Sequence, residues 1–147
     1  MPNQKLVIVG EGKQYKNKCL NYIKNKQLEK QVYFLKELNL EQLASLYQNA
    51  QMLIYPSLFE GFGIPIIEAL FCKTPVITSK NGCFSEAGGP SSIYIDPTDT
   101  EQMKIAILSI LGDQNKREQQ IKNGLEYVQR FNDETIAKKL MSTYLNL

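Results

Sequence analysis

The stretch "FEGFGIPIIEALFCKTPVI", from Phe59 to Ile77, places two glutamates, two glycines and a proline around one turn. Pro65 suits the first turn of a helix, because the N–H that proline lacks would have no partner there. Gly61 and Gly63, just before it, allow the backbone to turn sharply and a ligand to approach its N–H groups. The stretch therefore predicts a loop followed by a helix that begins at a binding site.

The predicted helix start has the features of an anion site. A helix N-terminus offers free N–H donors and a partial positive charge. Glu60 lies in the loop and Glu68 about one turn into the helix, so two hydrogen-bond acceptors flank the site. A ligand that carries both negative charge and hydroxyl groups, such as a nucleotide sugar, would satisfy all of these groups.

Each glutamate also has a simpler interpretation. Glu68 stabilises a first helical turn through the helix dipole without any ligand, and Glu60 fits an ordinary exposed loop residue. A pair of catalytic carboxylates of the glycosidase type also stays open, because that chemistry depends on a separation in space that sequence spacing does not give.

Short apolar segments alternate with longer amphipathic ones on both sides of this stretch. The predicted strands are Lys5–Val9, Val32–Leu35, Met52–Tyr55, Pro75–Thr78 and Ser92–Ile95. They are mostly apolar on both faces, as expected of parallel strands covered by helices on each side. The alternating order predicts one doubly wound α/β domain, in which ligands bind beyond the carboxyl ends of the strands.

Periodicity and capping signals predict the helices between and after these strands. In the first helix four residues share an apolar face: Tyr15, Cys19, Tyr22 and Ile23. Capping-box signals precede two further helices: Asn39 with Gln42, and Thr98 with Glu101. Two helices close the chain, over Asn115–Arg130 and Asp133–Leu145, whereas Ser79–Gly89 is predicted as a loop.

Composition narrows the class of protein. The chain has 147 residues, of which 43% are hydrophobic, enough for one sizeable core. Its 17 basic and 15 acidic residues give a net charge of +2 without a lysine-rich block, so we expect no nucleic-acid partner. No apolar run approaches the roughly 18 residues of a membrane span, and no signal-peptide pattern opens the sequence.

Cysteine and histidine usage adds two expectations. The three cysteines are far apart and lack metal-type spacing, which indicates reduced thiols in a cytoplasmic protein. The absence of histidine excludes Ser–His and Cys–His nucleophilic machinery and histidine zinc sites.

The stretch "SLFEGFGIPIIEALFCKTPVITS" closely resembles the E-x7-E signature of the retaining glycosyltransferases of family 4, the glycosyl transferases group 1. The segments "KLVIVGEG", "VYFLKELNLEQLASLYQNAQMLIYPS", "SEAGGPSSIYIDPTDTEQM" and "RFNDETIAKKLMSTYL" resemble further segments of that family, in the same order. The resemblance implies the C-terminal, Rossmann-like half of a GT-B fold. Residues 1–147 would form one nucleotide-sugar-binding domain, with its closing helices at about 115–147.

The same resemblance implies roles for individual residues. Glu60 would contact hydroxyl groups of the donor sugar as the catalytic residue, and Glu68 would accept both ribose hydroxyls. Two further groups of residues would bind the donor. The group along the sugar and diphosphate would be Gly61, Phe62, Gly63 and Ile64, and the group that borders the base would be Gly10, Lys36 and Leu38. The reaction would transfer a hexose from a UDP- or GDP-sugar with retention of configuration, without a cofactor or a metal ion.

The chain also departs from the family pattern. Lys36 and Lys73 stand where the family usually has glycine. The basic residues that neutralise the diphosphate would lie upstream of "KLVIVGEG", and Lys13 is a candidate substitute. We therefore expect an isolated donor domain, inactive by itself. Its first βα unit and its N-terminal acceptor domain would be missing from this chain, and that missing domain would supply any peripheral membrane association.

Two other functions remain open from the sequence. One is a non-catalytic module that binds a nucleotide sugar without turnover. The other is a dinucleotide-binding Rossmann domain, since "GEGKQY" follows a predicted strand and Glu37 ends the next strand as a ribose-binding acid would. However, Tyr15 stands where that fingerprint has its third glycine, which normally allows close packing of helix on strand.

Overall fold

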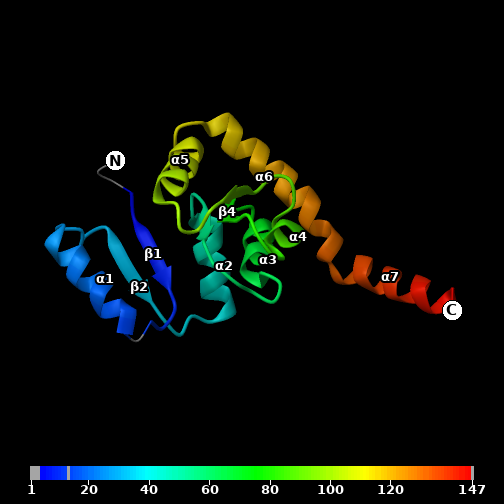
Figure 1. The fold of residues 1–147 in the computed structure, drawn as a ribbon. Coiled ribbons are helices and arrows are strands. Elements are labelled where there is room, and N and C mark those ends of the chain that lie inside the picture. The colour runs from blue at the N-terminus through cyan, green and yellow to red at the C-terminus, as the bar shows by residue number, and fades with distance from the viewer. Residues whose placement is uncertain (1–3, 13, 147) are drawn as a thin grey trace. The chain divides into compact units, whose positions relative to one another are not determined.

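The computed structural model describes residues 4–12 and 14–146. These residues divide into two compact units, Met1–Gln42 and Leu43–Leu147 (Figure 1). Both units alternate strands with helices, and every pair of hydrogen-bonded strands is parallel. The expected α/β class with parallel strands is confirmed. The strands form two sheets, β1-β2 and β3-β4-β5, one in each unit.

The first unit is a βαβ arrangement. It contains β1 (Leu6–Val9), α1 (Gln14–Asn25) and β2 (Val32–Leu35), and α2 (Leu40–Asn49) runs across the boundary between the units. β1 pairs with β2 from Leu6 opposite Val32 to Val9 opposite Leu35. The capping box before α2 is confirmed, because Gln42 N–H donates to Asn39 Oδ1 at 2.8 Å and Asn39 N–H donates to Gln42 Oε1 at 3.0 Å.

The apolar face predicted for α1 is only partly correct. Ile23 is buried and Cys19 half-buried, but Tyr15 and Tyr22 are 74% and 61% exposed. Successive helical residues turn by about 100°, so both tyrosines lie toward the edge of the face that Ile23 occupies. There the lysines three and four residues further along, Lys18 and Lys26, lie over the two rings at 6.0 Å.

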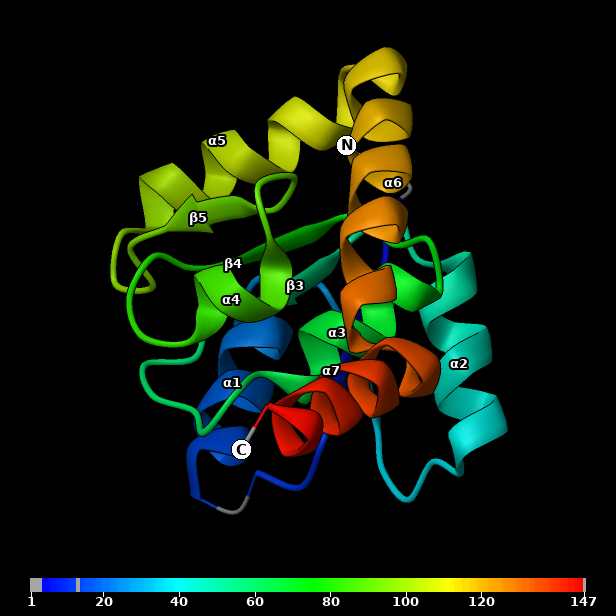
Figure 2. The same cartoon turned by 90° about the vertical axis from the view of Figure 1, so that its right-hand side faces the viewer.

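The second unit is built on three parallel strands. These are β3 (Leu53–Tyr55), β4 (Val76–Ser79) and β5 (Ile93–Ile95), with β4 in the centre and completely buried. Val76 packs in a cluster with α3 (Ile64–Phe71), whereas the next residue, Ile77, packs in a cluster with α5 (Thr100–Leu111). In Figure 2, α3 and α5 lie on either side of the strands. Because successive strand residues point to opposite faces, the sheet is covered on both sides, as predicted.

Two details of the second unit differ from the expectations. The N-cap of α5 is Asp99, whose carboxylate accepts from the N–H groups of Glu101 and Gln102 at 3.0 Å. Thr98 instead donates to Asp96 Oδ1, through its hydroxyl at 2.6 Å. The segment predicted as a loop after β4 contains a short helix, α4 (Phe84–Gly88), because Phe84 and Ala87 are buried in the same cluster as Val76.

Lys73 occupies a left-handed position at the end of α3. Lys73 N–H donates to Leu70 O at 3.1 Å and Thr74 N–H donates to Ala69 O at 2.9 Å. This pair of bonds is a Schellman motif, which requires a left-handed residue after the helix. Lys73 takes that place with φ 62°, a conformation that glycine adopts without strain.

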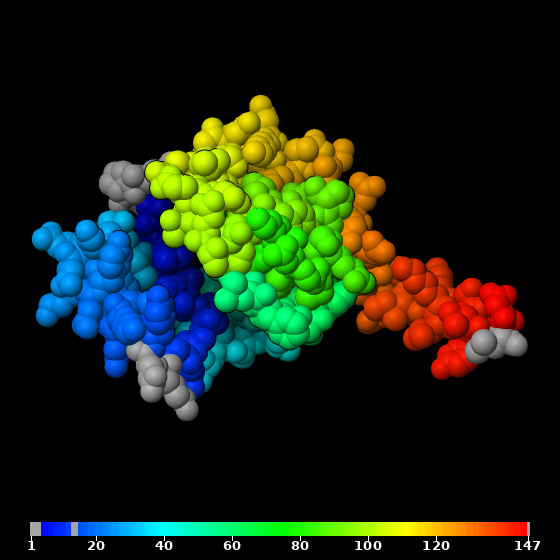
Figure 3. Space-filling model, in the orientation of Figure 1, coloured from blue at the N-terminus to red at the C-terminus, as the bar shows by residue number. Residues whose placement is uncertain are grey.

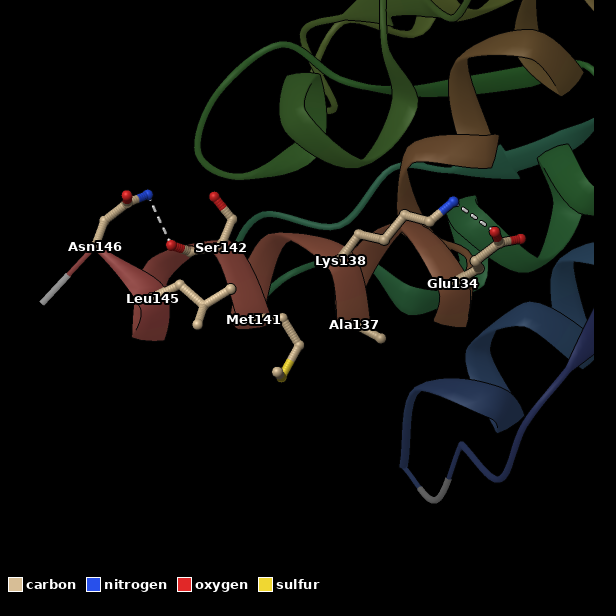
Figure 4. A pocket seen from close by; sticks show the side chains of 7 residues that line it. All are labelled: Glu134, Ala137, Lys138, Met141, Ser142, Leu145 and Asn146. Atoms are coloured by element: carbon tan, nitrogen blue, oxygen red, sulfur yellow. Dashed lines mark hydrogen bonds and ion pairs between the residues drawn. The ribbon is translucent and has the colours of Figure 1, made fainter.

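Three helical segments close the chain: α6 (Gln114–Val128), a 3₁₀ turn η1 (Gln129–Phe131) and α7 (Asp133–Leu145). α7 has no buried residue among those described, and its side chains lie outside the body of the second unit (Figure 3, orange to red). The shallow hollow along α7 is lined by this helix and the residue after it, Asn146 (Figure 4), so it does not enclose a ligand. Within the described part of the chain, no helix is long and apolar enough to cross a membrane.

Candidate functional site

The strongest candidate site is the loop between β3 and α3, at the carboxyl end of β3. α3 begins at Ile64 with Pro65 in its first turn, as predicted. Its N-cap is Gly63, which adopts the left-handed conformation with φ 97° and ψ 44°. No side chain caps this helix, and its first N–H groups therefore have no side-chain acceptor.

Three consecutive N–H groups at this helix start have no acceptor among the described residues. None of the hydrogen bonds found there uses the N–H of Phe62, Gly63 or Ile64. Pro65 has no N–H to satisfy, and Ile66 N–H donates to Gly63 O at 2.9 Å. Free donors at a helix N-terminus, together with the helix dipole, form a site for an anion such as a phosphate.

The two glycines of the loop have different functions in the backbone. Gly63 needs its positive φ, and a Cβ there would lie 3.1 Å from Ile66 Cδ1 and 3.5 Å from Ala87 Cβ. Gly61 lies in a bend of the chain, as expected, but it makes this bend without a positive φ. A Cβ at Gly61 would meet nothing within 4 Å, which leaves open space for a ligand to approach.

Glu60 is fixed by a neighbour on β3. Tyr55 Oη donates to Glu60 Oε1 at 2.7 Å. This bond, with the Ser57 hydroxyl as a smaller cause, lowers the pKa of Glu60 below its usual range, whereas burial and the same bond raise the pKa of Tyr55 to about 12. At neutral pH the pair is therefore a neutral phenol that donates to a carboxylate.

Glu68 has an equivalent neighbour on α2. Tyr47 Oη donates to Glu68 Oε2 at 3.2 Å. Tyr47 is only 9% exposed, and this burial, followed by the charge of Glu68, raises the pKa of Tyr47. The described residues offer no hydrogen bond to the other carboxylate oxygen, Oε1.

Side chains from β4 and from η1 hold the loop. Thr78 Oγ1 donates to Tyr55 O at 2.9 Å, and Ser79 Oγ donates to Ser57 O. The ring of Phe62 contacts that of Phe131 edge to face, with centroids 5.6 Å apart. The loop is thus tied to two other elements of its unit.

Sequence reasoning missed several of these partners. The sequence pattern assigns no polar role to Tyr47 and predicts Tyr55 only as the end of a strand. The signal available was the residue type: a tyrosine at a core position brings a hydroxyl that needs a partner when buried. Phe131 gave no signal, because it lies far from the loop in sequence.

The residues expected to border the base lie in the first unit, and their role stays a prediction. Gly10 has φ 137° and its N–H donates to Leu35 O at 3.0 Å. Lys36 Nζ lies 3.5 Å from Glu37 and 3.9 Å from Glu11, in exposed ion pairs that contribute little stability. Leu38 is half-buried.

Lys13, the candidate diphosphate ligand, lies outside the described residues. Among the residues that are described, no group of three His, Cys, Asp or Glu side chains could hold a metal ion.

Several known proteins resemble this chain in sequence or in fold. Over 104 residues the chain is 35% identical to the O-antigen chain mannosyltransferase B of Escherichia coli. The aligned region covers 71% of this chain and 27% of that protein. The sucrose-phosphate synthase of Thermosynechococcus elongatus superposes with a TM-score of 0.83 at 30% identity, over 97% of this chain and 38% of that one. Anabaena HepE, solved in complex with UDP-glucose, shares the fold with a TM-score of 0.86 at 24% identity, over 100% of this chain and 42% of that one.

These relatives are glycosyltransferases of the GT-B fold, and this chain has the architecture of their C-terminal, Rossmann-like half. The chain spans less than half the length of each of them. The family described as glycosyl transferases group 1 matches residues 1–127. This chain therefore belongs to the glycosyl transferases group 1.

Proposed function

We propose that this chain is the donor-binding part of a retaining glycosyltransferase, which transfers a hexose from a UDP- or GDP-sugar. The observation that carries the proposal is the uncapped start of α3. There the N–H groups of Phe62, Gly63 and Ile64 lack protein acceptors, and a glutamate held by a tyrosine lies in the chain on either side. Anion donors and diol acceptors in one short segment suit a sugar diphosphate.

Each group of the donor has a partner in this proposal. The diphosphate lies against the free N–H groups, where the helix dipole stabilises the charge that develops as the sugar leaves. Glu68 accepts from the ribose hydroxyls. Glu60 accepts from a hydroxyl of the hexose, with the carboxylate oxygen that Tyr55 does not occupy.

The anomeric configuration is retained because the acceptor hydroxyl attacks the sugar on the face that the diphosphate leaves. In this route a phosphate oxygen of the donor takes the proton of the acceptor hydroxyl, so the protein need not supply a histidine base. The reaction as proposed uses no cofactor beyond the nucleotide sugar. Support for a hexose comes from the Escherichia coli relative, a mannosyltransferase, and from the UDP-glucose bound to HepE.

We propose that the acceptor is bound by a further part of the enzyme, since the relatives are more than twice as long as this chain. We also propose that the enzyme acts in the cytoplasm, where nucleotide sugars would reach it, and that any contact with a membrane surface is made by that further part.

The donor specificity is tested by titrating the chain with UDP, GDP and a panel of their hexose conjugates in a calorimeter. We expect one nucleotide series to bind. Glu68→Ala should weaken that binding by about 1.5–3 kcal/mol, because it removes charge-assisted hydrogen bonds to the ribose.

Glu126→Ala is the matched control, since it removes the same charge from an exposed position on α6. The proposal fails if no member of the panel binds, or if the two alanine variants bind the nucleotide equally well.

A further inference from the structure

We propose that Tyr47 and Tyr55 are positioning residues of the donor site. Each holds one oxygen of a glutamate, so that the carboxylate presents its remaining acceptor positions to one ring of the ligand. Tyr55 acts through Glu60 on the hexose and Tyr47 acts through Glu68 on the ribose. This inference rests on the proposed function and assigns two residues that a nucleotide sugar need not touch.

Tyr55 is itself held on two sides. Its main-chain oxygen accepts from Thr78 Oγ1 at 2.9 Å, which fixes the end of β3 to β4. Its ring meets that of Phe84 edge to face, with centroids 6.4 Å apart. A phenol fixed in this way directs its hydroxyl to Glu60 Oε1 at 2.7 Å.

Tyr47 is fixed in the core of the second unit. It belongs to the buried cluster that includes Leu70 and Val76, and its main-chain oxygen accepts from Thr74 Oγ1 at 2.7 Å. Its hydroxyl reaches Glu68 Oε2 at 3.2 Å, across from α2 to α3. Burial of the ring needs no hydroxyl, so the hydroxyl serves the carboxylate.

The arrangement matches what a carboxylate can accept. An ionised carboxylate has about four lone-pair sites on its two oxygens. A tyrosine that occupies one of them orients the group and leaves at least two for ligand hydroxyls. The glutamate then loses less side-chain freedom when the ligand binds, which favours affinity.

Phenylalanine at either position tests the proposal, because it keeps the ring and removes only the donor. We expect Tyr47→Phe to weaken binding of the free nucleoside diphosphate and of the nucleotide sugar alike, by about 3- to 10-fold. We expect Tyr55→Phe to weaken only the nucleotide sugar by that factor. The measurement is calorimetric titration of the chain with UDP or GDP and with the conjugate that binds to the wild type.

Two further measurements separate positioning from general packing. In a Glu68→Ala background, Tyr47→Phe should have no additional effect on nucleotide affinity, since its partner is gone. The second measurement follows the preference for the nucleotide sugar over the free nucleotide as the pH is lowered. In Tyr55→Phe this preference should be lost at a higher pH than in the wild type. This shift follows because the hydrogen bond from Tyr55 lowers the pKa of Glu60, and its removal lets that carboxylate take up a proton earlier as the pH falls.

Tyr33→Phe is the control, since it removes a tyrosine hydrogen bond to Lys30 O at 2.9 Å in the first unit. The inference is overturned if both site variants bind every ligand as the wild type does. It is equally overturned if both lose affinity for all ligands to the same extent, or if Tyr47→Phe has its full effect without Glu68. A wild-type chain that binds no nucleotide or nucleotide sugar contradicts the proposed function, and this inference with it.

Discussion

Replacement of Gly63 by alanine tests whether the start of α3 depends on a left-handed residue. Gly63 has φ 97°, and a Cβ there would lie 3.1 Å from Ile66 Cδ1 and 3.5 Å from Ala87 Cβ. The substitution therefore adds backbone strain, and it requires the Ile66 side chain to move by a few tenths of an ångström. Gly61, two residues earlier, has no positive φ and no atom within 4 Å of the added Cβ.

The expected magnitudes follow from these two geometries. A non-glycine residue in the left-handed region costs about 1–2 kcal/mol. Alanine for glycine lowers the entropy of the unfolded chain and returns about 0.4–1 kcal/mol where the backbone is compatible. With the added contact to Ile66, we expect Gly63→Ala to lose about 1–2 kcal/mol of unfolding free energy, whereas Gly61→Ala is neutral or gains up to about 1 kcal/mol.

Urea denaturation followed by circular dichroism measures both variants. The unfolding free energies of the two variants should differ by about 2 kcal/mol. This difference should appear as a shift of the urea midpoint, while the dependence of the free energy on urea stays unchanged. We also expect Gly63→Ala to bind nucleotide more weakly, because relief of the strain would move the N–H groups of residues 62–64. Equal midpoints and equal nucleotide affinity for the two variants would refute the reasoning.

Two further substitutions test local conformation in the second unit. Asp99→Ala should lower the unfolding free energy measured by urea denaturation by about 1 kcal/mol, because Asp99 is the N-cap of α5. Thr98→Ser keeps a hydroxyl that can donate to Asp96, so an equally large loss in that variant would argue against this assignment. Lys73→Gly should raise the unfolding free energy by up to about 1 kcal/mol, since glycine relieves the left-handed strain at φ 62°; a melting temperature lower than that of the wild type would contradict this.

The elements that the sequence predicted well are those with a clear local pattern. The strand over Val32–Leu35 and the helix over Asp133–Leu145 have the predicted bounds, and the other four strands begin or end within one residue of them. Pro65 predicted the first turn of α3 because its fixed φ suits that turn, and Gly63 before it permits the left-handed conformation of the N-cap.

The errors have different causes, and the first is that several residues can give the same local signal. Thr98 and Asp99 are both good N-caps, and only the aspartate reaches the free N–H groups of α5. The short helix α4 has no periodic pattern long enough to detect, and it forms because Phe84 fits the core beside Val76.

The candidate site shows the same division. The start of α3 could be predicted, because Pro65 fixes its own φ and Gly63 permits the left-handed conformation found before the helix. The tyrosines behind the two glutamates could not, because Tyr47 meets Glu68 only when α2 and α3 pack together. Contacts between elements depend on tertiary packing, and a single sequence carries no direct record of them.

The edge-to-face contact between Phe62 and Phe131 links the loop between β3 and α3 to the turn that leads into α7. Chimeric enzymes made by exchanging C-terminal segments between relatives would replace Phe131 while leaving the loop unchanged. A graft that brings a small residue to that place would remove this contact to the Phe62 ring beside the free N–H groups at the start of α3, although every residue of the loop would still be present. The segment from η1 onward should therefore be exchanged together with the loop that Phe131 contacts.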